Sequence, residues 1–323
     1  MSDTPIVISD KRHGLPFSKG LMAQSFTATG LSPLRAYAAA QKVDDQIRAS
    51  GETTLSVSDL RALATSVLTD SAGEDYARRY MRLRELGKID KPLVILIGGT
   101  TGVGKSTIAT EIAHRLGITR IVSTDSIREV MRGIFSRDLM PAVYESSYDA
   151  WRALRVPVPQ GADPVIVGFR EQTAVVTTAI ESLIERSIRE GESVVIEGIH
   201  LVPGYLDPSI FVDAWVVPVI IAVDDDASHL SHFFIREVQT DGTRPLEKYR
   251  SNFANIRLLG RYIEELAREH DIRVIVSHQL DRTVAETLEH IVDTVIAEEG
   301  LRPARTSKAA PVSAPDKKEG SDA

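Results

Sequence analysis

Hydrophobic residues recur along residues 91–299 in short runs separated by longer amphipathic stretches. The apolar runs at 92–97, 119–123, 193–197, 214–222 and 272–277 are short and rich in valine and isoleucine, which predicts buried β-strands. Residues 106–116 place Ile108, Ile112 and Leu116 four positions apart, which predicts an amphipathic helix, and helical patterns also cover 169–190 and 249–270. Apolar strands that alternate with helices form parallel sheets covered on both faces. We therefore expect an α/β fold with a five-stranded parallel sheet, whose substrate crevice lies at the carboxyl ends of the strands.

The remainder of the chain has a different character. Residues 6–88 show mostly helical patterns after one extended start, and residues 301–323 are dominated by Pro, Ala, Ser and charged residues. Such a tail buries too little apolar surface to offset the entropy lost on ordering. We predict a small, mainly helical N-terminal domain at 1–90, the α/β domain at 91–299 and a disordered tail at 300–323.

Composition narrows the class of protein. The 323 residues carry a net charge of −7 and no cysteine, so nucleic acid is not expected as the main partner, and disulfides and thiolate metal sites are excluded. The longest apolar run, at 214–223, is about half of a membrane span. The start of the chain lacks a basic segment followed by an apolar core, so we do not expect it to be a signal peptide. We expect a cytoplasmic protein with no membrane partner, and the sequence leaves open whether it forms a homo-oligomer.

One glycine-rich segment between a predicted strand and a predicted helix carries specific chemistry. Residues 98–107 read GGTTGVGKST, in which glycines let backbone N–H groups turn toward phosphate oxygens at a helix N-terminus. Lys105 is suited to reach the β- and γ-phosphates of ATP, and the Ser106 hydroxyl is suited to bind Mg²⁺. We predict a nucleotide-binding phosphate loop that consists of Gly99, Thr100, Thr101, Gly102, Val103, Gly104, Lys105, Ser106 and Thr107.

An acidic residue and two arginines follow the second predicted strand. Asp125 comes just after this strand, and Arg128 and Arg132 follow three and seven positions later, on one face of a helix. Asp125 could orient or deprotonate a substrate hydroxyl, while the arginines could hold acidic groups. The alternative is that Ser123, Thr124 or Asp125 only caps a helix and that the arginines face water.

The third predicted strand ends in a second candidate group. Glu197 closes an apolar run, at the place where phosphate-loop proteins often carry the acidic residue that helps to order Mg²⁺. Gly198 would allow a ligand to approach the backbone, and His200 could contact substrate. A lone histidine is, however, more often a structural hydrogen-bonding group.

A basic segment follows the fourth predicted strand. Residues 232–263 contain six Lys or Arg side chains around a Gly–Thr–Arg–Pro turn, including Arg244, Arg250 and Arg257. Arginines on a mobile lid can neutralise the charge on a transferring phosphoryl group. Arg244 and Arg250 are our candidates for this catalytic role, and the alternative is a solvated basic face.

These segments together resemble a known family. The stretches GGTTGVGKSTIATEIAHRLGI, VSTDSIREVMR, VVIEGIHLVPG and TRPLEKYRSNFANIRLLGRYI look like those of 2-phosphoglycerate kinases, and the resemblance covers nearly all of residues 91–297. It implies a phosphate-loop kinase fold and the transfer of phosphate from ATP to 2-phosphoglycerate, which gives 2,3-bisphosphoglycerate. A kinase of another small anionic phosphorylated substrate, such as an inositol phosphate, and a regulatory nucleotide switch are the alternatives.

Residues 6–88 resemble a second family, the ATP-cone, a small helical nucleotide-sensing domain. The similarity lies in HGLPFSKGLMAQSFTATGLSPLRAYAAAQKVDDQI, LSVSDLRALATSVL and GEDYARRYMRLREL. The basic start is shortened here, although Lys11, Arg12 and Lys19 are present. The resemblance implies a nucleotide site, and the alternative is a helical module for packing or dimerisation.

Overall fold

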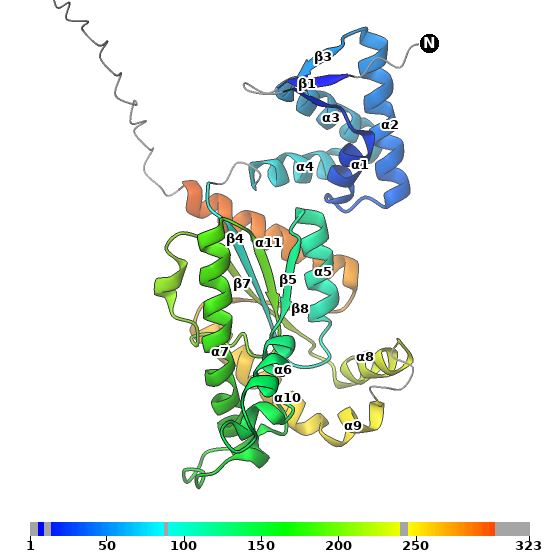
Figure 1. The fold of residues 1–323 in the computed structure, drawn as a ribbon. Coiled ribbons are helices and arrows are strands. Elements are labelled where there is room, and N and C mark those ends of the chain that lie inside the picture. Colours follow the sequence, from blue (N-terminus) through cyan, green and yellow to red (C-terminus); the bar gives the residue numbers. More distant parts are fainter. Residues whose placement is uncertain (1–5, 10–13, 87–89, 240–244, 301–323) are drawn as a thin grey trace, which may run out of the picture.

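A five-stranded parallel sheet forms the centre of the molecule (Figure 1). The computed structural model describes residues 6–9, 14–86, 90–239 and 245–300. The strand order is β5-β6-β4-β7-β8, so the first strand of the sheet in the chain lies in the middle. The strands are β4 (Leu93–Gly98), β5 (Arg120–Ser123), β6 (Val194–Glu197), β7 (Trp215–Ala222) and β8 (Arg273–Val276). All five predicted strands are confirmed, with ends within a residue or two of the expected ones.

Strand register aligns the ends that matter for function. Glu197, the last residue of β6, is paired with Ile97 of β4 on one side and with Ser123 of β5 on the other. The segments that leave β4, β5 and β6 therefore begin at the same edge of the sheet.

Helices cover both faces of the sheet, as the sequence predicts. Alternate residues of β4 point to opposite faces, since Ile95 packs in a cluster with Ile108 of α5 (Lys105–Leu116), while Leu96 packs with Ile180 of α7 (Pro164–Glu190). Helix α11 (Leu280–Gly300) shares the first face. Helices α6 (Thr124–Ile134) and α10 (Phe253–Glu269) lie on the second.

Two predicted helices differ from the observed ones at their starts. Helix α7 begins at Pro164 rather than at 169, because the Asp163 side chain accepts a hydrogen bond from the Val165 N–H at 2.8 Å and caps the helix. The predicted helix 249–270 is divided at Asn252 into α9 (Leu246–Ser251) and α10. Together with α8 (Asp226–Gln239), α9 projects from the sheet at the lower right of Figure 1. Short 3-10 helices lie at Pro141–Tyr144, Ala150–Ala153 and Pro208–Phe211.

The N-terminal region combines four helices with a small sheet. Strand β1 (Val7–Ser9) pairs antiparallel with β2 (Gly14–Pro16) and parallel with β3 (Thr54–Ser56), and β3 was not predicted because three residues carry no alternation to detect. The helices are α1 (Lys19–Thr27), α2 (Pro33–Ser50), α3 (Val57–Ala72) and α4 (Glu74–Leu86). A separate core forms around Phe26, Leu68 and Tyr80 and draws only on residues 6–80. The division of the chain into domains stays a prediction, and the predicted tail lies almost wholly outside the described residues.

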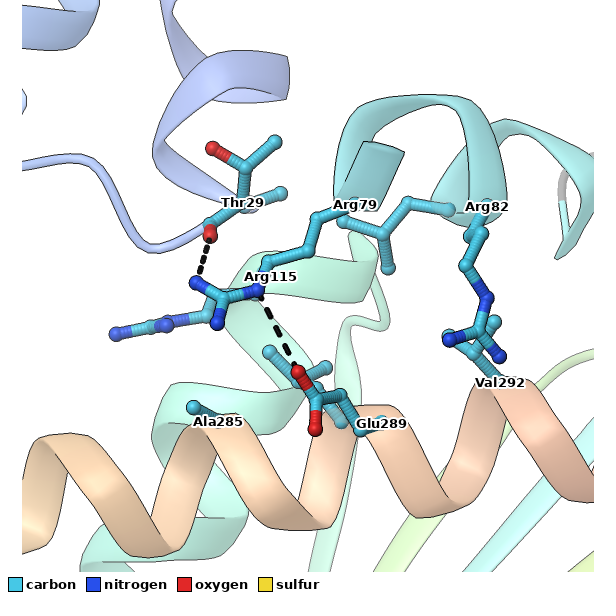
Figure 2. Close-up of a pocket in the computed structure, with 10 residues that line it drawn as sticks. Thr29, Arg79, Arg82, Arg115, Ala285, Glu289 and Val292 are labelled. Carbon is cyan, nitrogen blue, oxygen red and sulfur yellow. Dashed lines mark hydrogen bonds and ion pairs between the residues drawn. The ribbon is translucent and has the colours of Figure 1, made fainter. Parts of the chain in front are cut away.

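Helix α4 rests on the outer side of α11, above the sheet (Figure 1). Figure 2 shows the small cavity at this junction, of about 30 Å³, where Arg79 of α4 approaches Glu289 of α11 with 3.5 Å between Nε and Oε1. Arg82 forms a second ion pair with Asp293, and Arg115 at the end of α5 also lines the cavity. Among the helices of the described residues, none is long and apolar enough to cross a membrane.

Candidate active site

The phosphate loop connects β4 to α5 at the central strand of the sheet. Lys105, the first residue of α5, is buried, and its ammonium group donates a hydrogen bond to the Thr100 carbonyl at 2.6 Å. Burial lowers the pKa of Lys105, and the nearby charges of Glu197 and Asp125 oppose this shift. Both predicted acidic residues therefore act on the lysine that is expected to bind phosphate.

Ser106 and Glu197 meet beside this lysine. The Ser106 hydroxyl donates to Oε1 of Glu197 at 3.0 Å, and the Glu197 side chain is only 6% exposed. A hydroxyl and a carboxylate are hard oxygen ligands of the kind that Mg²⁺ prefers, and Mg²⁺ commonly takes one or two protein ligands in addition to phosphates and water. The chemistry of this donor pair fits the predicted metal role.

Asp125 and Arg128 occupy the first two turns of α6, next to the phosphate loop. Arg128 Nε lies 3.6 Å from Asp125 Oδ1, and Arg128 Nη1 donates to the carbonyls of Val143 and Glu145 at 3.1 and 2.7 Å. The Arg128 side chain is 15% exposed and Asp125 is largely exposed, so this arginine does not simply face water. Part of its guanidinium is used to hold the 143–145 segment, and Nε has no hydrogen-bond partner among the described residues.

Arg132 lies one turn further from the loop and is occupied at the surface. Its Nη1 donates to Glu129 at 2.6 Å, and the guanidinium lies 5.3 Å from the centre of the Tyr144 ring. Ser123 is the residue that precedes the first turn of α6, and its side chain makes no capping hydrogen bond. The capping alternative for Ser123 is therefore wrong.

His200 lies in a closed hydrogen-bond network beneath the site. The Gln172 amide N–H₂ group donates to the carbonyls of Ala142 and Glu145, at 2.6 and 3.0 Å, so its oxygen faces His200 Nε2 at 3.1 Å. A carbonyl oxygen only accepts, so Nε2 carries the proton, and Nδ1 accepts from the Thr124 hydroxyl at 2.9 Å. The ring is 1% exposed, and burial lowers its pKa to about 4. His200 is thus a neutral structural group in this structure, and both ring nitrogens are already bonded.

Gly198 allows two protein segments to approach each other. Its φ is +152°, and a Cβ at this position would overlap the Thr124 hydroxyl and lie 2.7 Å from Thr124 Cβ. The glycine therefore brings the end of β6 against the start of α6. Thr124 is thus the close neighbour among the described residues, and the approach of a ligand to Gly198 stays a prediction.

The predicted lid arginines have different surroundings. Arg244 lies outside the described residues. Arg250 is exposed on α9, and no described residue forms an ion pair with it. Arg257, predicted to lie behind them, bonds to the carbonyls of Val223 and Asp224 and to the Asp226 carboxylate, the last at 2.7 Å. Arg257 thus links α10 to residues 223–226, which follow β7.

Sequence reasoning did not identify the side chains that support the loop from behind. His229 and His232 of α8 bond to the carbonyls of Thr101 and Gly102, at 2.7 and 2.9 Å. Gln172 of α7 likewise holds the 142–145 segment through the carbonyls of Ala142 and Glu145. The sequence offers a weak sign of the first pair, two histidines three positions apart after a strand, but no sign of what they would contact.

A phosphate loop at the central strand of a parallel sheet, with an acidic residue at the end of the adjacent strand, defines a P-loop nucleotide-binding fold, the class to which the P-loop kinases belong. A scan against models of protein families found no match. Curated relatives named 2-phosphoglycerate kinase are 39% identical in Methanothermobacter thermautotrophicus over 289 residues and in Methanocaldococcus jannaschii over 300 residues. These matches cover 90% and 92% of this chain, and 94% and 95% of the relatives. The chain belongs to the 2-phosphoglycerate kinase family, and the expected family is confirmed.

These alignments of 289 and 300 residues are longer than the segment 91–299, even with the tail that follows it. They therefore include much of the N-terminal region. Shikimate kinase from Acinetobacter baumannii in complex with shikimate is a similar solved structure, with a TM-score of 0.37, 18% identity, and coverage of 66% of this chain and 97% of that one. As a member of a small-molecule kinase family, the protein uses ATP.

Proposed function

We propose that the protein transfers the γ-phosphoryl group of ATP to the free hydroxyl of 2-phosphoglycerate and forms 2,3-bisphosphoglycerate and ADP. The observation that carries this proposal is the convergence of Lys105, Glu197 and Asp125 at one edge of the sheet, where both carboxylates act on the buried lysine. Relatives that bear the name 2-phosphoglycerate kinase support the choice of acceptor.

The nucleotide side of the site would be formed by residues 99–107. Backbone N–H groups of the loop and the Lys105 ammonium would hold the β- and γ-phosphates, and Lys105 would leave the Thr100 carbonyl to do so. Ser106 and Glu197 would hold Mg²⁺, which supplies charge neutralisation on the phosphate oxygens when it is bound. Phosphoryl transfer needs little else from the protein than this positioning and charge compensation.

The acceptor side would be formed by α6. Asp125 would accept the hydrogen bond of the attacking hydroxyl and receive its proton as the new P–O bond forms and the bond to ADP breaks. Arg128 would hold the acceptor's phosphate or carboxylate through its Nε and Nη2 donors, since Nη1 already binds two carbonyls. Arg132 would be the outer substrate group and would have to exchange Glu129 for the substrate. Gly198 and His200 would shape the pocket through Thr124.

The lid would complete the site. Arg250 and Arg244 remain our candidates for contacts to the transferring phosphoryl group. Arg250 is exposed on α9 and forms no ion pair with any described residue, which supports this role. A homo-oligomer and a cytoplasmic location also remain expectations, as does the absence of nucleic acid among the partners.

The direct test is acceptor-dependent ADP formation. Purified protein with ATP and Mg²⁺ is offered 2-phosphoglycerate, 3-phosphoglycerate or an inositol phosphate, and the product is identified by ³¹P NMR. With 2-phosphoglycerate as the acceptor, we expect ADP to form, together with an equal amount of a product that shows a second phosphate ester signal. ADP formation that depends on another acid would show that this acid, and not 2-phosphoglycerate, is the acceptor. Nucleotide binding without turnover on any acceptor would favour the regulatory switch.

A further inference from the structure

The outer surface of the phosphate loop is clamped by helices that come much later in the chain. Thr101 and Gly102 present their carbonyl groups to α8, where His229 Nε2 and His232 Nδ1 lie 2.7 and 2.9 Å away. The preceding residue, Thr100, donates its hydroxyl to the Ile256 carbonyl of α10 at 3.0 Å. Three consecutive loop residues are therefore bonded to the segment 226–269.

The chemistry of these two contacts fixes the state of the rings. A backbone carbonyl only accepts a hydrogen bond, so His229 carries a proton on Nε2 and His232 carries one on Nδ1. His229 is fully buried, and burial lowers its pKa to about 4, so the ring is neutral at physiological pH. Its contribution to the site is therefore the direction of one hydrogen bond rather than added positive charge.

Aromatic packing holds the donors in place. The His229 ring stacks on Phe233 with 5.2 Å between centroids and forms a T-shaped contact with Phe253 at 5.5 Å. Phe233 in turn stacks on Tyr249 of α9 at 4.5 Å. Gly102 has φ +89°, and a Cβ there would lie 2.5 Å from Phe233 Cε1 and 3.0 Å from His229 Nε2. The loop glycine thus makes room for α8, in addition to any room it makes for phosphate.

We propose that His229 and His232 are positioning residues for ATP, which fix the Thr101 and Gly102 carbonyls outward so that the neighbouring N–H groups point at the triphosphate. In a trans peptide unit the C=O bond and the N–H bond of the next residue point in opposite directions. A carbonyl held on the outside of the loop therefore directs the next N–H toward the inside. The same bonds couple the orientation of α8, the first helix of the predicted lid, to the shape of the loop.

The test separates ATP from the acceptor. His229→Phe keeps a flat aromatic ring for the stack and removes the donor, His232→Ala removes the second donor from a partly exposed position, and His229→Gln restores an N–H donor. Phe234→Ala is the matched control, because Phe234 lies on the same helix and is 56% exposed. For each variant, the KM for ATP, the KM for 2-phosphoglycerate and the Kd for ADP by calorimetry are measured, with thermal unfolding alongside.

We expect His229→Phe and His232→Ala each to raise the ATP KM and the ADP Kd by roughly fivefold or more, which is the loss of one net hydrogen bond. The acceptor KM should stay within about twofold, His229→Gln should recover most of the affinity, and the control should match the wild type. Unchanged ADP affinity in His232→Ala would overturn the proposal. So would an equal rise in both KM values, because that pattern indicates general loosening of the fold.

Discussion

Replacement of Gly198 by alanine tests the contact between the end of β6 and the start of α6. The added Cβ would overlap the Thr124 hydroxyl and lie 2.7 Å from its Cβ and 2.9 Å from its Cγ2. Thr124 is fully buried and bonded to His200, so it has no free space into which it can move. The alanine would also have to adopt φ +152°, a backbone conformation that L-residues rarely adopt.

These two effects set the size of the expected loss. An unfavourable backbone conformation costs about 1–3 kcal/mol, and overpacking of a well-packed interior costs another 1–3 kcal/mol. We therefore expect Gly198→Ala to lower the free energy of unfolding by about 2–6 kcal/mol, a large part of the 5–15 kcal/mol typical of a folded domain. Gly191→Ala is the control, because Gly191 has φ +68° and a Cβ there would meet no heavy atom within 4 Å. This control should lose only the backbone contribution, about 1–2 kcal/mol.

Urea unfolding followed by circular dichroism measures both losses. The double variant Gly198→Ala, Thr124→Ala should recover part of the stability relative to the sum of the single changes, because the hydroxyl and Cγ2 are gone while Thr124 Cβ remains close. If Gly198→Ala and Gly191→Ala cost the same, the Thr124 contact does not restrict this position and the reasoning is refuted. The reasoning is also refuted if the stability loss of the double variant equals the sum of the losses of the two single variants.

Four further outcomes are expected. Lys105→Ala should abolish ADP formation without a fall in unfolding midpoint, since the lysine is buried at a cost to its charged form, and near-normal turnover would contradict its role. Asp125→Asn should lower kcat strongly with little change in ADP affinity by calorimetry, whereas a change confined to ADP affinity would place the acceptor elsewhere. Between pH 6.5 and 4 the unfolded chain takes up the proton that buried His200 excludes, so stability should fall as the pH is lowered through this range. His200→Gln should remove on the order of 3 kcal/mol of that loss in urea titrations at each pH, and an unchanged slope would refute the assigned burial effect. Nucleotide binding that persists in Lys105→Ala and disappears with Lys19→Ala would establish a second site in the N-terminal region, and no residual binding would leave that region a packing module.

The parts of the fold that follow from local pattern were predictable. The central strand β4 is buried along its whole length, and the glycine-rich loop lies between this strand and its helix, so fold class and phosphate loop could be predicted from neighbouring residues. Glu197 was predictable for a topological reason, because the ends of adjacent parallel strands lie at one edge. Asp125 was predictable for the same reason, because it follows the end of β5, which is adjacent to β6.

The parts that depend on distant partners were not predictable. His200 is bonded by Thr124, 76 positions earlier, and by Gln172, 28 positions earlier, and nothing in the local sequence announces either partner. Arg128 binds carbonyls 15 and 17 positions further on, which the spacing from Asp125 could not show. The identity of a side chain indicates which bonds it can make, whereas the fold decides which of them are already used.

The position of the N-terminal region constrains any influence it has on catalysis. Helix α4 contacts α11 through the ion pairs of Arg79 with Glu289 and of Arg82 with Asp293, and Arg115 at the end of α5 lines the same cavity (Figures 1 and 2). The phosphate loop lies at the opposite end of α5. Helix α5 has 12 residues and therefore spans about 18 Å from Lys105 to the end that lies at this cavity. Lys19, one of the basic groups expected to hold a nucleotide, is already bonded to Gln41 at 2.6 Å and lies 5.0 Å from the Tyr37 ring centre. A nucleotide bound in this region would thus have to displace that bond and then act on the loop through a rigid helix, whereas a packing role requires only the contacts that α4 already makes.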